Sequence, residues 1–383
     1  MLKRLKKLLF LNRIDSRSLH HFDLNESKIN KKFVFFKSDR KLSEKAIYRI
    51  FSFSQRLKKD EKNSKKEDLW DSIISHEDHL RLINYCLKEE KTNFENLISL
   101  CNKTNLTKGF LNYYSYNDLQ SSKKNRNKEA TQFLDKLISL AEYRKLTQVF
   151  NPEQGKWLLS DLNFTNILDN VFNYKSKNIK PFLSPNFTYG LQHQNNFYCL
   201  KDLKSLYTAI KTEELSRIYK FDQISEIGSG LGYLPYYSYI LNNLNYNVYD
   251  LPNILILQAY FLMISLGEEK IHLYGESKNK GKQISLLPYW EIFNENENKI
   301  LWISQDSIPE IDLNLSKKFF DKISKCNSSY FLSINQESKN INVAGTVQEP
   351  VYSIIRGINN FKLLNRSRDF LRKGYIEEFY MIR

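Results

Sequence analysis

The sequence predicts a doubly wound α/β domain that follows a mainly helical N-terminal domain. Three observations support this prediction. Short apolar runs alternate with helical segments after Phe221, apolar residues recur every three or four positions from Trp70 to about Arg144, and a glycine-rich turn directly follows the first apolar run of the C-terminal third. Strands that alternate with helices are typical of a parallel sheet with helices on both faces.

The N-terminal segment is a strongly basic leader. Residues 1–66 carry 20 Lys and Arg against 7 Asp and Glu, whereas residues 67–383 carry 38 against 36. We expect this leader to be weakly ordered, apart from a short strand within residues 33–40. Because the rest of the chain is almost neutral, we expect no nucleic-acid partner.

Residues 1–14 place leucines at helical spacing among lysines and arginines. Two interpretations stay open: a solvated helix, or peripheral contact with an anionic membrane surface. No apolar run reaches the length needed to span a bilayer, and no secretory cleavage site follows, so the sequence predicts a cytoplasmic protein. The four cysteines have no C-x-x-C spacing, which predicts reduced, buried thiols.

Residues 67–215 predict a helical domain and a connection. Amphipathic helices are expected up to about Arg144, and a polar, proline-containing connection follows them. A further helix is expected over residues 202–220. We expect the connection to act as a lid over the C-terminal domain, which the pattern assigns to residues 216–383.

The glycine-rich turn lies in the run EIGSGLGY, with Glu226 before Gly228, Gly230 and Gly232. A dinucleotide-binding fingerprint requires its third glycine one residue later, and a P-loop requires a Gly-Lys-Ser/Thr that does not follow. The remaining pattern, an acidic residue and then G-x-G-x-G, resembles motif I of the class I S-adenosylmethionine-dependent methyltransferases.

The second predicted strand ends in an acidic residue, Asp250, 18 residues after Gly232. A carboxylate at the carboxyl end of a parallel strand faces the crevice where ligands bind, and its two oxygens suit two vicinal hydroxyls. A purely structural interpretation also stays open, in which Glu226 starts a turn and Asp250 caps the helix that begins at Pro252.

The resemblance implies a Rossmann-like class I methyltransferase domain with S-adenosyl-L-methionine as cofactor. It implies that the glycines let the backbone approach the cofactor, that Glu226 orients the methionine ammonium group and that Asp250 holds the ribose. It also implies that Glu276 contacts the adenine amino group. The positions assigned to the cofactor are Glu226, Gly228, Gly230, Gly232, Asp250, Leu251, Glu276 and Gln305.

The segment after the fourth strand bears on the acceptor. It lacks the Asn/Asp-Pro-Pro-aromatic tetrad of enzymes that methylate base amines and the Pro-Cys of cytosine C5 enzymes. The run ILWISQDSIPEID, together with EIGSGLGYLPYY and YDLP, is similar to a sugar O-methyltransferase family associated with bacterial surface-glycan gene sets. This resemblance covers about residues 150–383 and implies methyl transfer to a hydroxyl of a nucleotide-linked sugar or a glycan.

Such a transfer needs an in-line acceptor oxygen and a group that accepts its proton. Asp306 is the first candidate for this general base, with a capping role as its structural alternative. Glu310 is expected to bind acceptor hydroxyls, and His193, on the lid, is an alternative base. We expect no metal. A non-sugar metabolite as acceptor, or a catalytically silent fold that binds the cofactor, are the competing functions.

Overall fold

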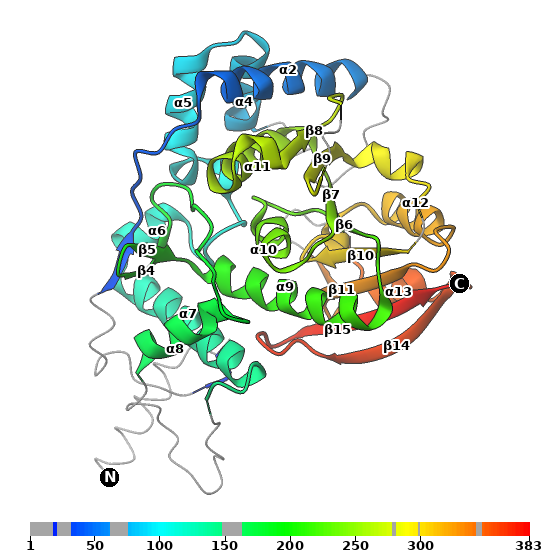
Figure 1. Cartoon of the computed structure of the whole chain (residues 1–383). Coiled ribbons are helices and arrows are strands. Elements are labelled where there is room, and N and C mark those ends of the chain that lie inside the picture. The colour runs from blue at the N-terminus through cyan, green and yellow to red at the C-terminus, as the bar shows by residue number, and fades with distance from the viewer. Residues whose placement is uncertain are drawn as a thin grey trace, which may run out of the picture.

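The computed structural model describes residues 18–20, 32–61, 76–147, 163–277, 281–297, 299–341 and 347–383. Its centre is an eight-stranded sheet with the order β14-β15-β11-β10-β6-β7-β9-β8 (Figure 1). The five apolar runs predicted as strands after Phe221 all lie in this sheet. Its strands are β6 (Gln223–Ile227), β7 (Asn245–Asp250), β8 (Ile271–Leu273), β9 (Ile284–Pro288), β10 (Ile300–Gln305), β11 (Tyr330–Gln336), β14 (Phe361–Arg368) and β15 (Tyr375–Ile382).

The sheet is mixed rather than parallel throughout, which corrects the expectation from the sequence. The strands from β8 to β11 in this order pair in parallel, but β15 pairs antiparallel with both β11 and β14. The reason is the short connection between β14 and β15, because parallel neighbours need a crossover of a dozen or more residues. Gly374, at φ +76°, directly precedes β15 in this connection.

Both faces of the sheet are covered, and β10 shows this residue by residue. Leu301 and Ile303 pack in one apolar cluster, with α9 (Leu200–Tyr219), α10 (Tyr233–Leu241) and α11 (Pro252–Leu266). Ile300 and Trp302 pack in the other cluster, with α12 (Leu313–Ile323) and α13 (Val351–Ile355). Alternate side chains point to opposite faces of a strand, so a strand covered on both faces is apolar throughout.

The N-terminal helices pack against the C-terminal α/β part of the chain, and helix α11 explains why. Its sequence PNILILQAYFLMISL is apolar on all sides, and such a helix must be buried all round. The sheet covers one side, and α2 (Glu44–Glu61) with α4 (Glu77–Leu87) covers another (Figure 1). Residues 32–61 of the predicted leader are therefore folded, contrary to the expected weak order.

The remaining helices and small sheets surround this centre. Helix α7 packs between α8 and α9 (Figure 1), and the short strand expected within residues 33–40 is β1, which pairs antiparallel with β4. The bounds are β1 (Phe33–Phe35), α5 (Lys91–Ser99), η2 (Cys101–Lys103), η3 (Asn105–Thr107), α6 (Tyr116–Ser121), α7 (Lys123–Tyr143), α8 (Phe164–Phe172), β2 (Asn173–Tyr174), β3 (Lys177–Asn178), β4 (Tyr189–His193), β5 (Asn196–Tyr198), η4 (Glu268–Lys270), η5 (Tyr289–Asn294), η6 (Ile308–Glu310), β12 (Asn340–Ile341) and β13 (Val347–Gln348).

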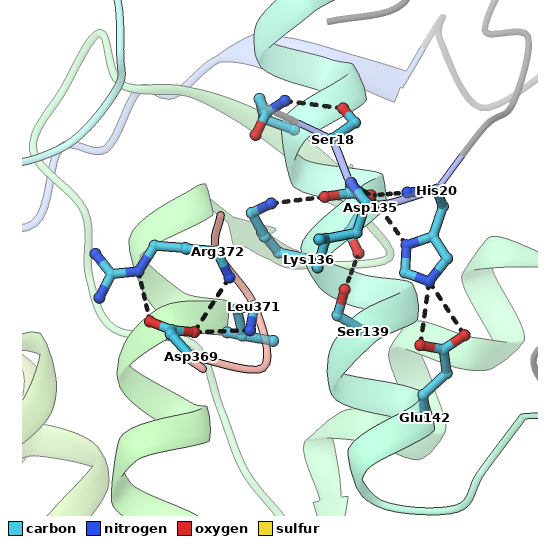
Figure 2. Close-up of polar contacts among 11 residues, drawn as sticks. Ser18, His20, Asp135, Lys136, Ser139, Glu142, Asp369, Leu371 and Arg372 are labelled. Atoms are coloured by element: carbon cyan, nitrogen blue, oxygen red, sulfur yellow. Dashed lines mark hydrogen bonds and ion pairs between the residues drawn. The ribbon is translucent and has the colours of Figure 1, made fainter. Parts of the chain in front are cut away.

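A short N-terminal stretch, residues 18–20, is attached to α7 (Figure 2). The backbone N–H groups of Leu19 and His20 both donate to Oδ1 of Asp135, at 2.8 and 2.7 Å. The His20 ring lies 2.9 Å from the same oxygen and 3.1 Å from the carboxylate of Glu142. Burial alone would lower the pKa of His20, but the two carboxylates raise it to about 9.

All four cysteines are buried, and none forms a disulfide. Within the described ranges, no helix is both long and apolar enough to cross a membrane. The stretch 1–14, for which membrane-surface contact was considered, lies outside the described residues.

Candidate functional site

A cavity of about 330 Å³ lies at the carboxyl ends of β6, β7 and β10. Strand β6 lies between β7 and β10, so the chain leaves β6 toward one side and later returns on the other. Ligands of doubly wound sheets bind at this kind of reversal in the strand order. Seven of the residues predicted from the sequence line this cavity. They are Glu226, Gly228, Gly230, Asp250, Gln305, Asp306 and Glu310.

The turn after β6 depends on its glycines. The three glycines of this turn have positive φ values, which residues with a side chain rarely adopt. The values are +72° at Gly228, +60° at Gly230 and +90° at Gly232. A Cβ on Gly228 would lie 2.5 Å from Cβ of Ser307, and one on Gly232 would lie 2.9 Å from Leu262. Gly230 faces the Phe110 ring across the cavity, so a side chain there would enter the cavity.

Asp250 stabilises this turn from the end of the neighbouring strand. Its Oδ2 accepts hydrogen bonds from the backbone N–H of Ser229 at 2.9 Å and from Gln258 at 2.7 Å, and its Oδ1 accepts from the Leu251 N–H at 2.8 Å. The helix cap before Pro252 is Leu251, without a side-chain bond. Asp250 thus fixes the glycine turn, and burial raises its pKa to about 6.

Glu226 is buried at the end of β6, beside the same turn. The Tyr246 hydroxyl donates to its Oε2 at 2.9 Å. Burial is the main reason why the pKa of Glu226 rises to about 7, although Lys201 acts in the opposite direction. A carboxylate in these surroundings gains charge when a cation binds next to it.

Asp306 follows β10 with φ +60° and lies among cations. Its Oδ1 accepts from Nη1 of Arg372 at 2.6 Å, and its Oδ2 lies 3.9 Å from Nζ of Lys201. Burial would raise the pKa of Asp306, but Arg372, Lys201 and Lys204 together hold it at about 2. The side chain is therefore a permanent anion, and it caps no helix, since the residue at the start of η6 is Ser307.

Glu310 lies one turn further on, in the same cavity, and differs from Asp306. Among the described residues, no side chain forms an ion pair or a hydrogen bond with its carboxylate. Burial, and then repulsion by Asp306, raise its pKa to about 7. Glu310 can therefore exchange a proton near neutral pH, which Asp306 cannot.

Three sequence-predicted residues lie elsewhere. Glu276 forms an ion pair with Arg49 of α2 at 2.9 Å, away from the cavity. His193 lies at the end of β4, with Nε2 2.9 Å from the carboxylate of Asp169. Gly232 packs against α11. Nothing in the sequence indicated that Arg49, Asp169 and α11 are the partners of these residues, because the partners are distant along the chain.

A second, smaller cavity adjoins the first, and Leu251 lies in its wall. The two cavities share Gly228, Asp250 and Ser307, and the walls of the second are otherwise mostly apolar. Its lining residues are Ile227, Gly228, Tyr249, Asp250, Leu251, Tyr289, Ser307, Ile311, Leu315 and Phe319.

Several cavity residues carry no local sequence signal. Lys201 and Lys204 come from the first turns of α9, and Phe110 and Tyr113 come from the segment after η3. Arg372, which binds the cavity residue Asp306 from behind the lining, comes from the connection between β14 and β15, where it also binds Asp369 (Figure 2). Only the tertiary fold brings these residues to the strand ends, so a pattern along the chain could not identify them.

Comparison with known proteins finds distant structural likeness only. No protein-family model matches the sequence, and no curated protein matches it. Among solved structures, the mitomycin 7-O-methyltransferase MmcR is 10% identical with a TM-score of 0.36, and the match covers 48% of this chain and 57% of that one.

Two further solved structures show the same level of likeness. The magnesium protoporphyrin IX methyltransferase ChlM from Synechocystis PCC 6803, solved with bound SAH, is 11% identical over 50% of this chain and 90% of its own, with a TM-score of 0.35. The glycopeptide N-methyltransferase MtfA, complexed with sinefungin, is 9% identical over 46% and 86%, with a TM-score of 0.34.

Proposed function

We propose that this protein is an S-adenosylmethionine-dependent O-methyltransferase that acts on a sugar hydroxyl. The observation that carries the proposal is the cavity itself. A glycine-rich turn and two buried carboxylates, Glu226 and Asp250, meet there, and a third carboxylate, Glu310, lines the same cavity without an ion-pair partner among the described residues.

The residues of the cavity fit this cofactor. Its methionine ammonium and its sulfonium are cationic, and the raised pKa values of Glu226 and Asp250 favour a cationic neighbour. The absence of a side chain on Gly230 leaves the backbone of the turn open to the cavity, where a Cβ would already contact Phe110 at 3.5 Å. The adjoining cavity, which Leu251 lines, has a volume of only about 50 Å³ and mostly apolar walls, so it offers the adenine ring an apolar edge rather than a full pocket. We therefore assign adenine recognition to this cavity rather than to Glu276.

The chain's own residues supply positioning and proton transfer. When bound, S-adenosylmethionine supplies a methyl group that its positive sulfur already activates. Glu310 accepts the proton of the acceptor hydroxyl on a carboxylate oxygen, because its proton affinity matches neutral pH. Asp306, held as an anion by Arg372 and Lys201, positions these cations beside the acceptor.

A sugar acceptor is favoured by the aromatic and polar mixture of the lining. Phe110, Tyr113 and Tyr375 present ring surfaces next to charged groups, and binding sites of this kind combine apolar walls with a few polar contacts. Incubation with cofactor labelled at the methyl group, and with panels of nucleotide sugars, glycans and non-sugar phenols, tests this point. Label found only in the phenols would contradict the sugar assignment.

Cofactor binding is tested by calorimetric titration of the full chain with S-adenosylmethionine. We expect Asp250→Ala to weaken binding by roughly 1.5–3 kcal/mol, the range for hydrogen bonds to a charged group. Asp250→Asn keeps the shape of the side chain but removes its charge. Comparison of the two variants therefore separates the effect of the lost charge from the effect of the lost hydrogen bonds that fix the glycine turn. Asp321→Ala, at an exposed position on α12, is the matched control. Unchanged affinity in both Asp250 variants would contradict the ribose role.

A second variant tests the space at the turn. Gly230→Val places a branched side chain where φ is +60° and where Phe110 stands opposite, so we expect no measurable heat with S-adenosylmethionine. A folded Gly230→Val protein, judged by circular dichroism, that still binds the cofactor would show that the cavity holds another ligand.

A further inference from the structure

Three lysines line the cavity. Lys201 and Lys204 are three residues apart on α9, so they lie on the same side of the helix, and Lys108 lines the cavity from the segment after η3. Arg372 lies next to them, on the far side of Asp306. Such a group of positive charges at a ligand cavity needs compensating anions.

Asp306 and Asp369 compensate Arg372 and Lys201, but no carboxylate among the described residues forms an ion pair with Lys204 or with the exposed Lys108. Arg372 binds both Asp306 and Asp369, and Lys201 lies 3.9 Å from Asp306. Among the described residues, Nζ of Lys204 has no ion-pair or hydrogen-bond partner; it lies 4.9 Å from the centre of the Tyr113 ring. A half-buried ammonium group without an anion is unfavourable.

The electrostatic surroundings of Lys204 also indicate that its ammonium group lacks a compensating anion. Burial, and then repulsion by Arg372, lower the pKa of Lys204 to about 8, although Asp306, Asp369 and Glu129 act in the opposite direction. A bound anion would restore the ammonium form, because an opposite charge close by favours ionisation.

The position of Lys204 associates it with the acceptor rather than with the glycine turn. Lys201 interacts electrostatically with Glu226, beside the turn, whereas the charges that act on Lys204 are those of Arg372, Asp306, Asp369 and Glu129. Its ring contact, Tyr113, also comes from the helical part of the chain. Lys204 is thus one helical turn beyond the lysine that faces the cofactor residues.

We propose that Lys204, together with Lys108, binds an anionic group of the acceptor, so that the acceptor is a sugar that carries a phosphate or a carboxylate. This inference rests on the proposed function, because it assigns the class of acceptor to the same cavity. An ammonium group binds either anion as a point charge, so the shared chemistry is an oxyanion next to the sugar ring.

The experiment titrates the full chain, loaded with S-adenosylhomocysteine, with three probes: glucuronate, glucose 1-phosphate and uncharged glucose. We expect heat from at least one of the anionic probes and weaker binding of glucose. Lys204→Gln is expected to weaken the anionic probe roughly tenfold or more, and Lys204→Arg to retain it. Lys318→Gln, an equal change of charge at an exposed site of α12, is the control and leaves the affinity unchanged.

Dependence on pH gives a second readout. Glucuronate stays ionised from pH 7 to 9, so its affinity is expected to fall as the pH rises through about 8 and Lys204 loses its proton. Lys204→Arg is expected to remove this fall, because the guanidinium stays charged.

Each failure can be told apart. Anionic probes that bind no tighter than glucose, or a Lys204→Gln variant that loses affinity for S-adenosylhomocysteine but not for the anion, overturn the inference. The second result would assign the lysine to the methionine carboxylate. No heat with S-adenosylhomocysteine itself contradicts the proposed function, and titration of the unloaded chain with the same anions then still tests the lysine site.

Discussion

Asp306 and Glu310 are four positions apart and border the same cavity, but their surroundings give them opposite protonation behaviour. Arg372 and Lys201 keep Asp306 ionised even in acid, with a pKa of about 2. Glu310 has no such cation in contact, and its pKa is about 7. A general base works best when its pKa lies near the operating pH, so we propose Glu310 as the base in place of Asp306, the first candidate from the sequence.

This difference predicts that Glu310→Gln lowers kcat by roughly 10²–10⁴-fold, the usual contribution of a general base. At saturating cofactor, the kcat of the unchanged protein is expected to rise with pH through about 7, because only the ionised carboxylate accepts a proton. Steady-state assays across this range, with calorimetry of S-adenosylhomocysteine as a check on cofactor binding, measure both effects.

The matched variant is Asp306→Asn, since asparagine tolerates the positive φ of this position. We expect it to lower the melting temperature, because Arg372 loses one of its two carboxylates, and to keep the pH profile of kcat. A profile that disappears in Asp306→Asn but persists in Glu310→Gln would restore Asp306 as the base.

The raised pKa of Glu226 leads to a separate prediction, which concerns the effect of pH on the binding of S-adenosylmethionine. Its pKa of about 7 means that the anionic form, which attracts a cation, dominates only above neutrality. The affinity for S-adenosylmethionine is therefore expected to increase from pH 6 to 8, with release of protons on binding below pH 7. Titrations in buffers of different ionisation enthalpy detect these protons, and Glu226→Gln is expected to abolish the dependence.

At the scale of elements, the attachment of residues 18–20 to α7 is a charged, partly buried contact. His20 lies between Asp135 and Glu142, and Asp135 is also bound by its neighbour Lys136 at 2.6 Å (Figure 2). The histidine pKa is raised from 6.5 to about 9 in the folded protein. The contact therefore contributes its full stability below about pH 6.5 and loses it as the pH rises through 9.

We predict that His20→Ala lowers the free energy of unfolding by on the order of 2 kcal/mol at pH 6, and by much less at pH 10. Denaturant unfolding at the two pH values measures this difference. His76→Ala, at the exposed cap of α4, is the control histidine. Equal losses for His20→Ala at both pH values would show that the ring contributes through packing rather than through its charge.

Elements with a strong local pattern could be predicted, and those defined by their neighbours could not. The glycine turn, β6, β7 and β10 could be predicted because the turn needs positive φ and because short runs with apolar residues alternate there with helical segments. Helix α2 was not predicted because it lies in a basic segment; its lysines face solvent, while Ile47, Ile50 and Phe51 are buried. The predominantly apolar sequence of α11 indicated that another segment covers this helix, but not which segment does so.

At the scale of the whole molecule, the helical and α/β parts share one apolar core. A single cluster of buried side chains extends from α2 through α11 to the sheet. Arg49 of α2 reinforces this contact by binding Glu276 and the backbone oxygens of Glu268 and Ile271. The predicted boundaries at residues 66 and 215 therefore do not separate independent cores.

We predict that removal of residues 1–66 prevents cooperative folding, because it uncovers the apolar surface of α11. Thermal unfolding followed by circular dichroism tests this, and the full chain is expected to show one transition. Removal of residues 1–14 alone is the control, which we expect to keep both the transition and the turnover of a soluble acceptor. A chain of residues 67–383 that melts at the same temperature as the full chain would refute the shared core.

The close approach of Gly228 to Ser307 couples two loops that are distant in sequence. A methyl group does not fit between them, and the Ser307 hydroxyl donates to the carbonyl of Ile227. The turn after β6 and the segment after β10 are therefore held together by close packing and by a hydrogen bond. For the proposed methyltransferase, this contact fixes the cofactor turn relative to Glu310, so we expect differences in acceptor preference to arise from α9 and the segment around Tyr113 instead.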